Sequence, residues 1–91
     1  MASEKYGFTG KITLHQSGAY LNIPKRTVES ASLNDKELLH LELRNQDGQV
    51  LETTRKTTVT SGKAKVYLTK DTKQSLDLQD KDLIDVFFHK D

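Results

Sequence analysis

The chain repeats its own sequence at a spacing of 45 residues, and this repeat limits its possible folds more than any other feature. Residues 11–44 align without a gap with residues 56–89, and ten of the 34 aligned pairs are identical. The identical pairs are Lys11/Lys56, Thr13/Thr58, Ala19/Ala64, Lys25/Lys70, Thr27/Thr72, Ser30/Ser75, Leu33/Leu78, Asp35/Asp80, Lys36/Lys81 and Leu38/Leu83. The apolar positions keep the same order in both halves, so the halves are expected to fold alike.

Each half is too short to form a stable core by itself. The chain has 91 residues and no cysteine, whereas units of about 40 residues usually need disulfides, metals or oligomerisation to fold. We therefore expect one domain, residues 1–91, made of two half-repeats of about 4–48 and 49–91 that share one core. In this arrangement the chain supplies both halves of a pseudo-dimer.

The alternation of polar and apolar residues predicts a mainly β fold with two short helices. In the first half it predicts strands at 11–15, 19–23 and 39–43, a helix at 25–32 that begins after Pro24, and a strand at 50–54 that leads into the second half. The second half repeats this order with strands at 57–60, 64–68 and 83–89 and a helix at 70–76, while Tyr6 and Phe8 mark a further strand at the start. Most of these eight strands are short, and a closed β-barrel leaves no edges exposed. We therefore expect a small barrel with a pseudo-twofold axis, whose core contains Leu14, Leu21, Ile23, Leu33, Leu39, Leu41, Val59, Val66, Leu68, Leu78, Ile84 and Val86.

The motifs of the first half resemble the AbrB-type swapped-hairpin domain. They are Thr9-Gly10-Lys11-Ile12, Ser17-Gly18, Ile23-Pro24 and the stretch from Leu33 to Leu43. The second half has Leu68-Thr69 where the family pattern has Ile-Pro. Members of this family are usually homodimers of one such unit, and the related cradle-loop barrels are single chains with an internal duplication, so the interleaving of the strands stays open. The resemblance implies a DNA-binding transcription regulator or the antitoxin of a toxin–antitoxin pair.

The sequence contains no arrangement typical of an enzyme. There is no glycine-rich phosphate loop and no nucleophile elbow. His15, His40 and His89 lie on three different predicted strands, so we expect no metal site. The carboxylates of Asp35, Glu37, Asp80 and Asp82 lie in loops and are interpreted as turn formers. We therefore expect neither catalysis nor a cofactor.

Basic residues gather in the first strands and at the helix start of each half. The formal net charge is only +1, but residues 1–26, 27–53, 54–73 and 74–91 carry +3, −4, +5 and −3 in turn. Lysines interleaved with Thr, Asn and Tyr suit contacts with the phosphates of double-stranded DNA. The candidate DNA-binding residues are Lys11, Tyr20, Asn22, Lys25, Arg26, Arg55, Lys56, Lys63, Lys65, Tyr67, Lys70 and Lys73. Two alternatives stay open: a solvated basic surface, and a site for an acidic protein.

An apolar patch offers a different function. Phe87 corresponds to Glu42 in the repeat and is expected to point outward, next to an outward-pointing Phe8. Together with the acidic strands, this patch would make the chain a protein-binding module, as in an antitoxin or inhibitor protein. No apolar run is long enough for a membrane span or a signal peptide, so we expect a cytoplasmic protein, either a monomer or a homodimer.

Overall fold

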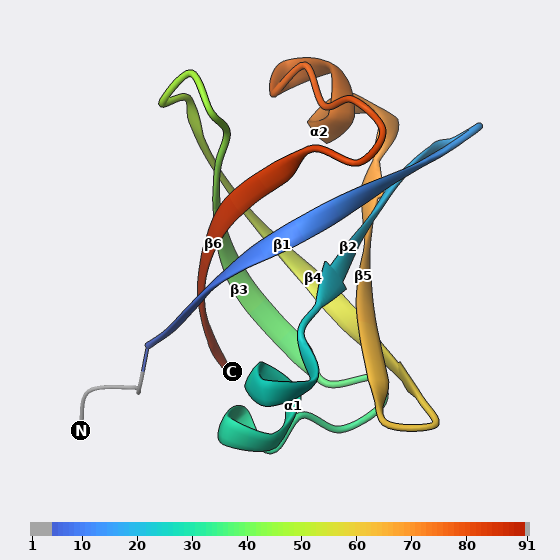
Figure 1. The fold of residues 1–91 in the computed structure, drawn as a ribbon, viewed down its shortest axis with the longest axis vertical. Coiled ribbons are helices and arrows are strands. Elements are labelled where there is room, and N and C mark those ends of the chain that lie inside the picture. Colours follow the sequence, from blue (N-terminus) through green and yellow to red (C-terminus); the bar gives the residue numbers. More distant parts are fainter. Residues whose placement is uncertain (1–4, 91) are drawn as a thin grey trace.

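The computed structural model describes residues 5–90, which form six strands and two short helices (Figure 1). The elements are β1 (Tyr6–His15), β2 (Gly18–Ile23), α1 (Lys25–Ala31), β3 (Leu38–Arg44), β4 (Val50–Thr60), β5 (Lys63–Thr69), α2 (Lys70–Ser75) and β6 (Leu83–Lys90). The strands form a closed barrel, which confirms the expected mainly β fold with two short helices. Within residues 5–90, neither helix has the length or apolarity to cross a bilayer. Glu4 and Asp91, which fall at the ends of the predicted half-repeats, lie outside the described residues.

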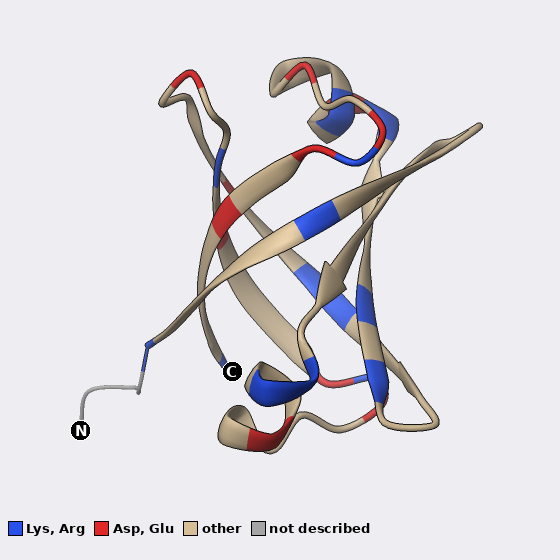
Figure 2. Cartoon of the chain, viewed as in Figure 1, with Lys and Arg blue, Asp and Glu red and all other residues tan. Residues whose placement is uncertain are grey.

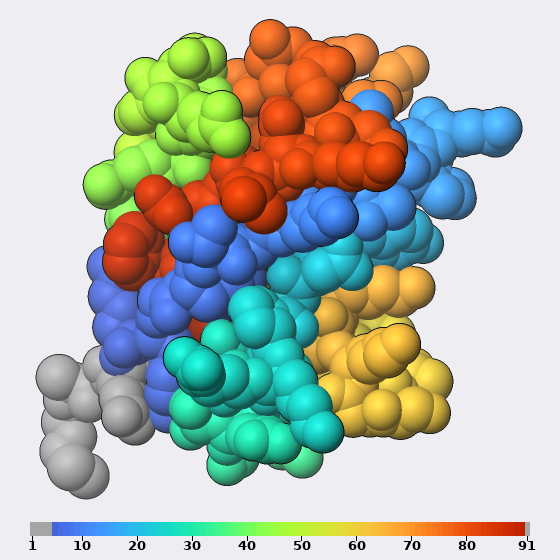
Figure 3. Space-filling view, in the orientation of Figure 1, coloured from blue at the N-terminus to red at the C-terminus, as the bar shows by residue number. Residues whose placement is uncertain are grey.

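The strands of the two halves are interleaved around the barrel in the order β1-β2-β5-β4-β3-β6. Every neighbouring pair is antiparallel. In Figure 3, the red surface of β6 lies directly against the blue surface of β1, where the first and last strands close the barrel. Each strand therefore has two neighbouring strands in the ring.

The prediction of eight strands is wrong, because two pairs of predicted strands are continuous. Residues 6–11 of β1 pair with β6 and residues 11–15 pair with β2, so β1 changes its partner without ending. In the same way, residues 50–56 of β4 pair with β3 and residues 57–60 with β5. Gly10 lies where β1 changes partner. A larger residue would not fit at this position, because its Cβ would lie 2.5 Å from Leu21 Cδ1. This glycine makes room for the core and does not end the strand.

The predicted core is largely correct. Ten of its twelve members are buried, while Leu14 and Val59 are half-buried and pack against the edge of the cluster. Ile12, Leu43 and Phe88 add large, fully buried side chains. At about 25 cal/mol per Å² of apolar area, this shared cluster is the main stabilising contribution to the fold.

The expected patch of Phe8 and Phe87 is wrong. Phe8 packs against the core, with its ring edge-on to Phe88 at a centroid distance of 5.8 Å. Phe87 lies on the outer face, where its ring covers Gly7. Residues that are neighbours along a strand face opposite sides, and Phe8 pairs with the inward-facing Val86 and not with Phe87.

Each half is fastened to the other by the loop that follows its helix. Asp80 Oδ1 accepts a hydrogen bond from the Leu14 N–H (3.1 Å), and Asp35 Oδ1 accepts one from the Val59 N–H (2.9 Å). The adjacent carboxylates of Glu37 and Asp82 accept hydrogen bonds within their own loops. The interpretation as turn formers is confirmed for Glu37 and Asp82, whereas Asp35 and Asp80 bind a strand of the other half.

The pairings of the two halves also correspond at the spacing of 45 residues. Ile12↔Leu21 in the first half matches Thr57↔Val66 in the second, and Gly10↔Ile84 matches Arg55↔Leu39. The α-helices follow the same rule, because Pro24 precedes α1 and Thr69 precedes α2, where the Thr69 side chain accepts a hydrogen bond from the Thr72 N–H. The twofold axis itself stays a prediction, and these registers are consistent with it.

Candidate nucleic-acid interface

The candidate residues of the two halves meet because β2 and β5 are neighbours in the barrel. Tyr20 pairs with Tyr67, and Asn22 pairs with Lys65. Lys11 pairs with Asn22 and Thr58 with Lys65, so one row of outward side chains crosses four strands: Lys11, Asn22, Lys65 and Thr58. Figure 2 shows the positive segments on β1, β4 and β5.

We call the outer surface of β2, β5, residues 11–15 and residues 56–60 the basic face. Its four lysines, Lys11, Lys56, Lys63 and Lys65, are all exposed. The other outward side chains of these strands are Thr13, His15, Tyr20, Asn22, Thr58, Thr60 and Tyr67, so no carboxylate projects from the strands of this face. Asp35 and Asp80 lie at its two margins, where both carboxylates bind backbone N–H groups.

The polar side chains at the centre of the basic face are held by internal contacts. The Asn22 amide donates hydrogen bonds to the Lys11 carbonyl oxygen (2.9 Å) and to Thr13 Oγ1 (3.0 Å). The Tyr67 hydroxyl donates to the carbonyl oxygen of Ser17. Lys65 Nζ lies 4.5 Å from the centre of the Tyr20 ring, within range of a cation–π interaction. Of the two tyrosines, Tyr67 is therefore committed to the fold through its hydroxyl.

Arg55 differs from the lysines in where it points. It occupies an inward position in the alternation of β4 and is half-buried. Its Nε donates to the Tyr67 carbonyl oxygen (3.1 Å), and its guanidinium lies 5.7 Å from the Tyr67 ring centre. Arg55 thus bridges β4 and β5 where β4 changes partner. The structure does not bring it together with the exposed lysines.

The basic residues of the two helices lie beyond opposite ends of the basic face. Ile23, before α1, pairs with Ala64 at the start of β5, whereas Thr69, before α2, is opposite Gly18. Figure 1 accordingly shows α1 and α2 at opposite ends of the barrel. Lys25, Arg26 and Lys70 are exposed, and Lys73 is half-buried. Between these ends β2 runs from Gly18 to Ile23, about 17 Å at 3.3 Å per strand residue.

The opposite wall of the barrel, formed by β3, β6 and the first parts of β1 and β4, has a different character. It carries Glu42, Glu52 and Asp85, and it also carries Phe87. His40 and His89 pair across β3 and β6, with their rings stacked at a centroid distance of 4.8 Å. Sequence reasoning missed this histidine pair, because the β3–β6 register cannot be read from alternation alone. Within residues 5–90, no group of three or more His, Asp or Glu side chains is placed to hold a metal ion.

Comparison of the chain with models of protein families, with curated proteins and with solved structures found no match.

Proposed function

We propose that the chain is a DNA-binding transcription regulator that contacts the duplex through the basic face. The observation that carries this proposal is the row of side chains across β1, β2, β5 and β4, in which lysines alternate with Asn and Thr. Lysines supply phosphate contacts, and amide and hydroxyl groups can contact sugars or base edges. The regulatory role is supported by the resemblance of the motifs to the AbrB type.

The size of the basic face suits a duplex. Its two ends are separated by β2, about 17 Å long by the rise of a strand, which is less than the roughly 34 Å of one helical turn of DNA. Lys25 and Arg26 at one end and Lys70 at the other could therefore contact phosphates on the two sides of one groove. Lys11, Lys56, Lys63 and Lys65 would lie between them.

The test is a mobility shift of random-sequence duplex DNA at about 20 mM salt, where electrostatic binding is strongest. We expect the wild type to bind and Lys63→Glu/Lys65→Glu to lose most of the binding. The matched control is Lys5→Glu/Arg44→Glu, which makes the same change of charge on the opposite wall, near Phe87. The control should bind almost as the wild type does.

A salt titration gives the second readout of this proposal. Binding through about six phosphate contacts should give a log–log slope against salt near −5. Absence of any shift at the lowest salt, or equal loss in both double variants, would contradict a duplex-binding role for the basic face.

A second candidate function is a protein-binding module on the opposite wall. Phe87 favours it, since this half-buried ring lies on the outer face with Lys5 Nζ at 5.6 Å and the Arg44 guanidinium at 5.8 Å from its centre. A partner held mainly by this apolar side chain would show far weaker salt dependence than DNA. With Phe8 inside the barrel, the patch is smaller than the sequence indicated.

A further inference from the structure

The basic face differs between its two halves at corresponding positions. In the first half, His15 and Tyr20 form a cluster of rings with Tyr67, with centroids 5.6 Å and 5.7 Å apart. Their counterparts at the spacing of 45 residues are Thr60, Lys65 and Asn22, respectively. Three rings in contact at one end of the face thus correspond to three smaller or more flexible polar side chains at the other.

The turns beside these clusters differ in the same way. Gly18 brings the β1–β2 turn so close to β5 that a Cβ at this position would overlap the Leu68 carbonyl oxygen. The Tyr67 hydroxyl then reaches Ser17 and fastens this turn. The counterpart of Gly18 is Lys63, a long side chain that is exposed. The first turn is therefore closed against its neighbour strand.

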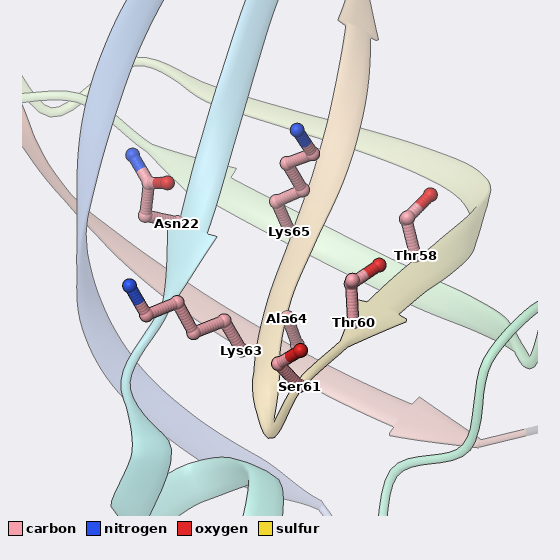
Figure 4. Close-up of a pocket in the computed structure, with 7 residues that line it drawn as sticks. All are labelled: Asn22, Thr58, Thr60, Ser61, Lys63, Ala64 and Lys65. Carbon is pink, nitrogen blue, oxygen red and sulfur yellow. The ribbon is translucent and has the colours of Figure 1, made fainter.

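The second end of the face is hollowed into a groove of about 460 Å³. Figure 4 shows Thr58 and Thr60 projecting from β4 on one side of β5, and Asn22 projecting from β2 on the other. We call it the open groove, and it is lined by Asn22, Thr58, Thr60, Ser61, Lys63, Ala64 and Lys65. Its volume lies within the range of pockets that hold small molecules, roughly 300–1,000 Å³.

The chemistry of the lining defines the class of ligand. It contains two ammonium groups, one amide and three hydroxyls, and no carboxylate. Lys63 and Lys65 leave the same strand on the same side, about 7 Å apart by the rise of two residues. Lys65 can share an anion with Lys63 once its Nζ leaves the Tyr20 ring, where it lies 4.5 Å from the ring centre. A phosphate monoester carries a charge of about −1.5 to −2 at pH 7. The hydroxyls of Thr58, Thr60 and Ser61 match the hydroxyls of a sugar.

We propose that the open groove binds a phosphate monoester attached to a pentose. The inference deepens the proposed function, because the open groove is part of the basic face, and a phosphorylated 5′ end of a DNA strand carries this chemistry. A free pentose phosphate carries the same chemistry. The first-half end of the face, filled by its rings, does not bind such a group.

The experiment follows backbone amide NMR shifts of the full chain during titration with ribose 5-phosphate, ribose and inorganic phosphate. We expect saturable shifts at residues 58–65 with ribose 5-phosphate, and affinities at least about tenfold weaker for the other two probes. Absence of shifts with ribose 5-phosphate, or equal affinity for inorganic phosphate, would overturn the proposal.

Two variants and one control locate the site. Thr60→Tyr fills the open groove and should weaken ribose 5-phosphate binding at least tenfold, whereas His15→Tyr, the same change at the counterpart position, should leave it unchanged. Thr58→Val/Thr60→Val removes two hydroxyls with little change of shape. This variant therefore tests the groove even if the tyrosine of Thr60→Tyr disturbs the β4–β5 hairpin. Wild-type affinity in both groove variants would place the ligand elsewhere and overturn the proposal.

Binding of duplexes with and without a 5′-phosphate distinguishes the two sources of the sugar phosphate, a DNA strand end and a free pentose phosphate. It also distinguishes a failure of the groove proposal from a failure of the proposed duplex binding. If the strand end is the source, the phosphorylated duplex should bind more tightly than the 5′-hydroxyl duplex, and Thr60→Tyr should remove the difference. Equal binding of both duplexes, with shifts from ribose 5-phosphate retained, identifies the free sugar phosphate as the ligand and supports the groove. If neither duplex binds but ribose 5-phosphate does, the proposed duplex binding is contradicted and the groove proposal stands. If the duplexes bind but ribose 5-phosphate does not, the groove proposal is contradicted and duplex binding stands.

Discussion

At the scale of single residues, Thr57 is the polar exception inside the core. Its side chain is 1% exposed, and its Oγ1 is buried without a hydrogen-bond partner among residues 5–90. The backbone of Thr57 is satisfied, since its N–H donates to the Glu37 carbonyl oxygen and its own carbonyl oxygen accepts from the Lys36 N–H. The hydroxyl alone is therefore unpaired. Its counterpart in the repeat is the apolar Ile12.

Replacing Thr57 by valine should stabilise the protein. Burying an unpaired hydroxyl costs roughly 1–3 kcal/mol, and valine has nearly the same shape without the polar atom. We expect Thr57→Val to raise the free energy of unfolding by about 1 kcal/mol, measured as a higher urea midpoint at unchanged slope.

The matched control is Thr72→Val at the other end of the barrel. Thr72 is also buried, but its Oγ1 lies 3.2 Å from Thr69 Oγ1 in a hydrogen bond. This substitution should destabilise the protein by about 1 kcal/mol. A loss of stability in Thr57→Val as well would show that the Thr57 hydroxyl has a partner in solution.

At the scale of elements, the loops after the helices do more than connect. Loop 78–82 closes on β1 through Asp80, and loop 33–37 closes on β4 through Asp35. Each loop covers the stretch of strand that lies beyond the partner's first residue, where the backbone would otherwise lack a neighbour. Aspartate occurs at this position in both halves, and in each half it makes the same contact with a strand of the other half.

Removing either aspartate should weaken the junction between the halves by a similar amount. We expect Asp35→Ala and Asp80→Ala each to lower the free energy of unfolding by about 1–2 kcal/mol, because each frees a backbone N–H from a charged acceptor. The two effects should add in the double variant, since the sites lie apart. Urea unfolding measures all three.

Asparagine serves as the control for these two positions. Asp35→Asn and Asp80→Asn keep a side-chain oxygen that can accept from the same N–H, so each should cost less than the alanine variant. Equal losses for asparagine and alanine would contradict the role assigned to this acceptor.

The accuracy of sequence reasoning differs between elements for physical reasons. Both helices were predicted within one residue at each end, because Pro24 sets the start of the first and the 45-residue repeat gives the matching position of the second. The inward and outward residues of β2 and β5 also follow from alternation, which correctly placed Lys63 and Lys65 outside.

What the sequence could not show depends on pairing register. Phe8 and Arg55 share the inward faces of Ile12 and Val59 because β1 and β4 are each one continuous strand. His40 and His89 meet only through the β3–β6 pairing. Alternation reports which residues share a face of a strand, but not which strand lies opposite.

At the scale of the whole molecule, the barrel has two walls of opposite character. The basic face lies on β2, β5 and the second parts of β1 and β4, whereas Glu42, Glu52 and Asp85 lie on β3, β6 and the first part of β4. Each strand among residues 5–90 already has two neighbouring strands in the ring, which leaves little strand edge for pairing with a second copy. Phe87 is the one large aromatic side chain of β6 on the outer face, and it is partly covered.

We accordingly expect a monomer in solution. Sedimentation at two protein concentrations, a factor of about 100 apart, should give the same mass near 10.3 kDa. Phe87→Glu should sediment identically. A mass that rises with concentration and falls back to the monomer value in Phe87→Glu would instead assign the outer wall to a dimer interface.

The pairing of β1 with β6 has a consequence for the time the protein takes to fold. Tyr6 is opposite Phe88, so barrel closure joins residues 82 positions apart. At synthesis rates of about 5–20 residues per second, β1 waits about 4–16 s for its partner to be made. Such non-local pairing also places refolding in the range of milliseconds to seconds. During synthesis, residues 6–11 of β1 stay without their partner strand until β6 is complete, and in this interval the nascent chain is open to aggregation.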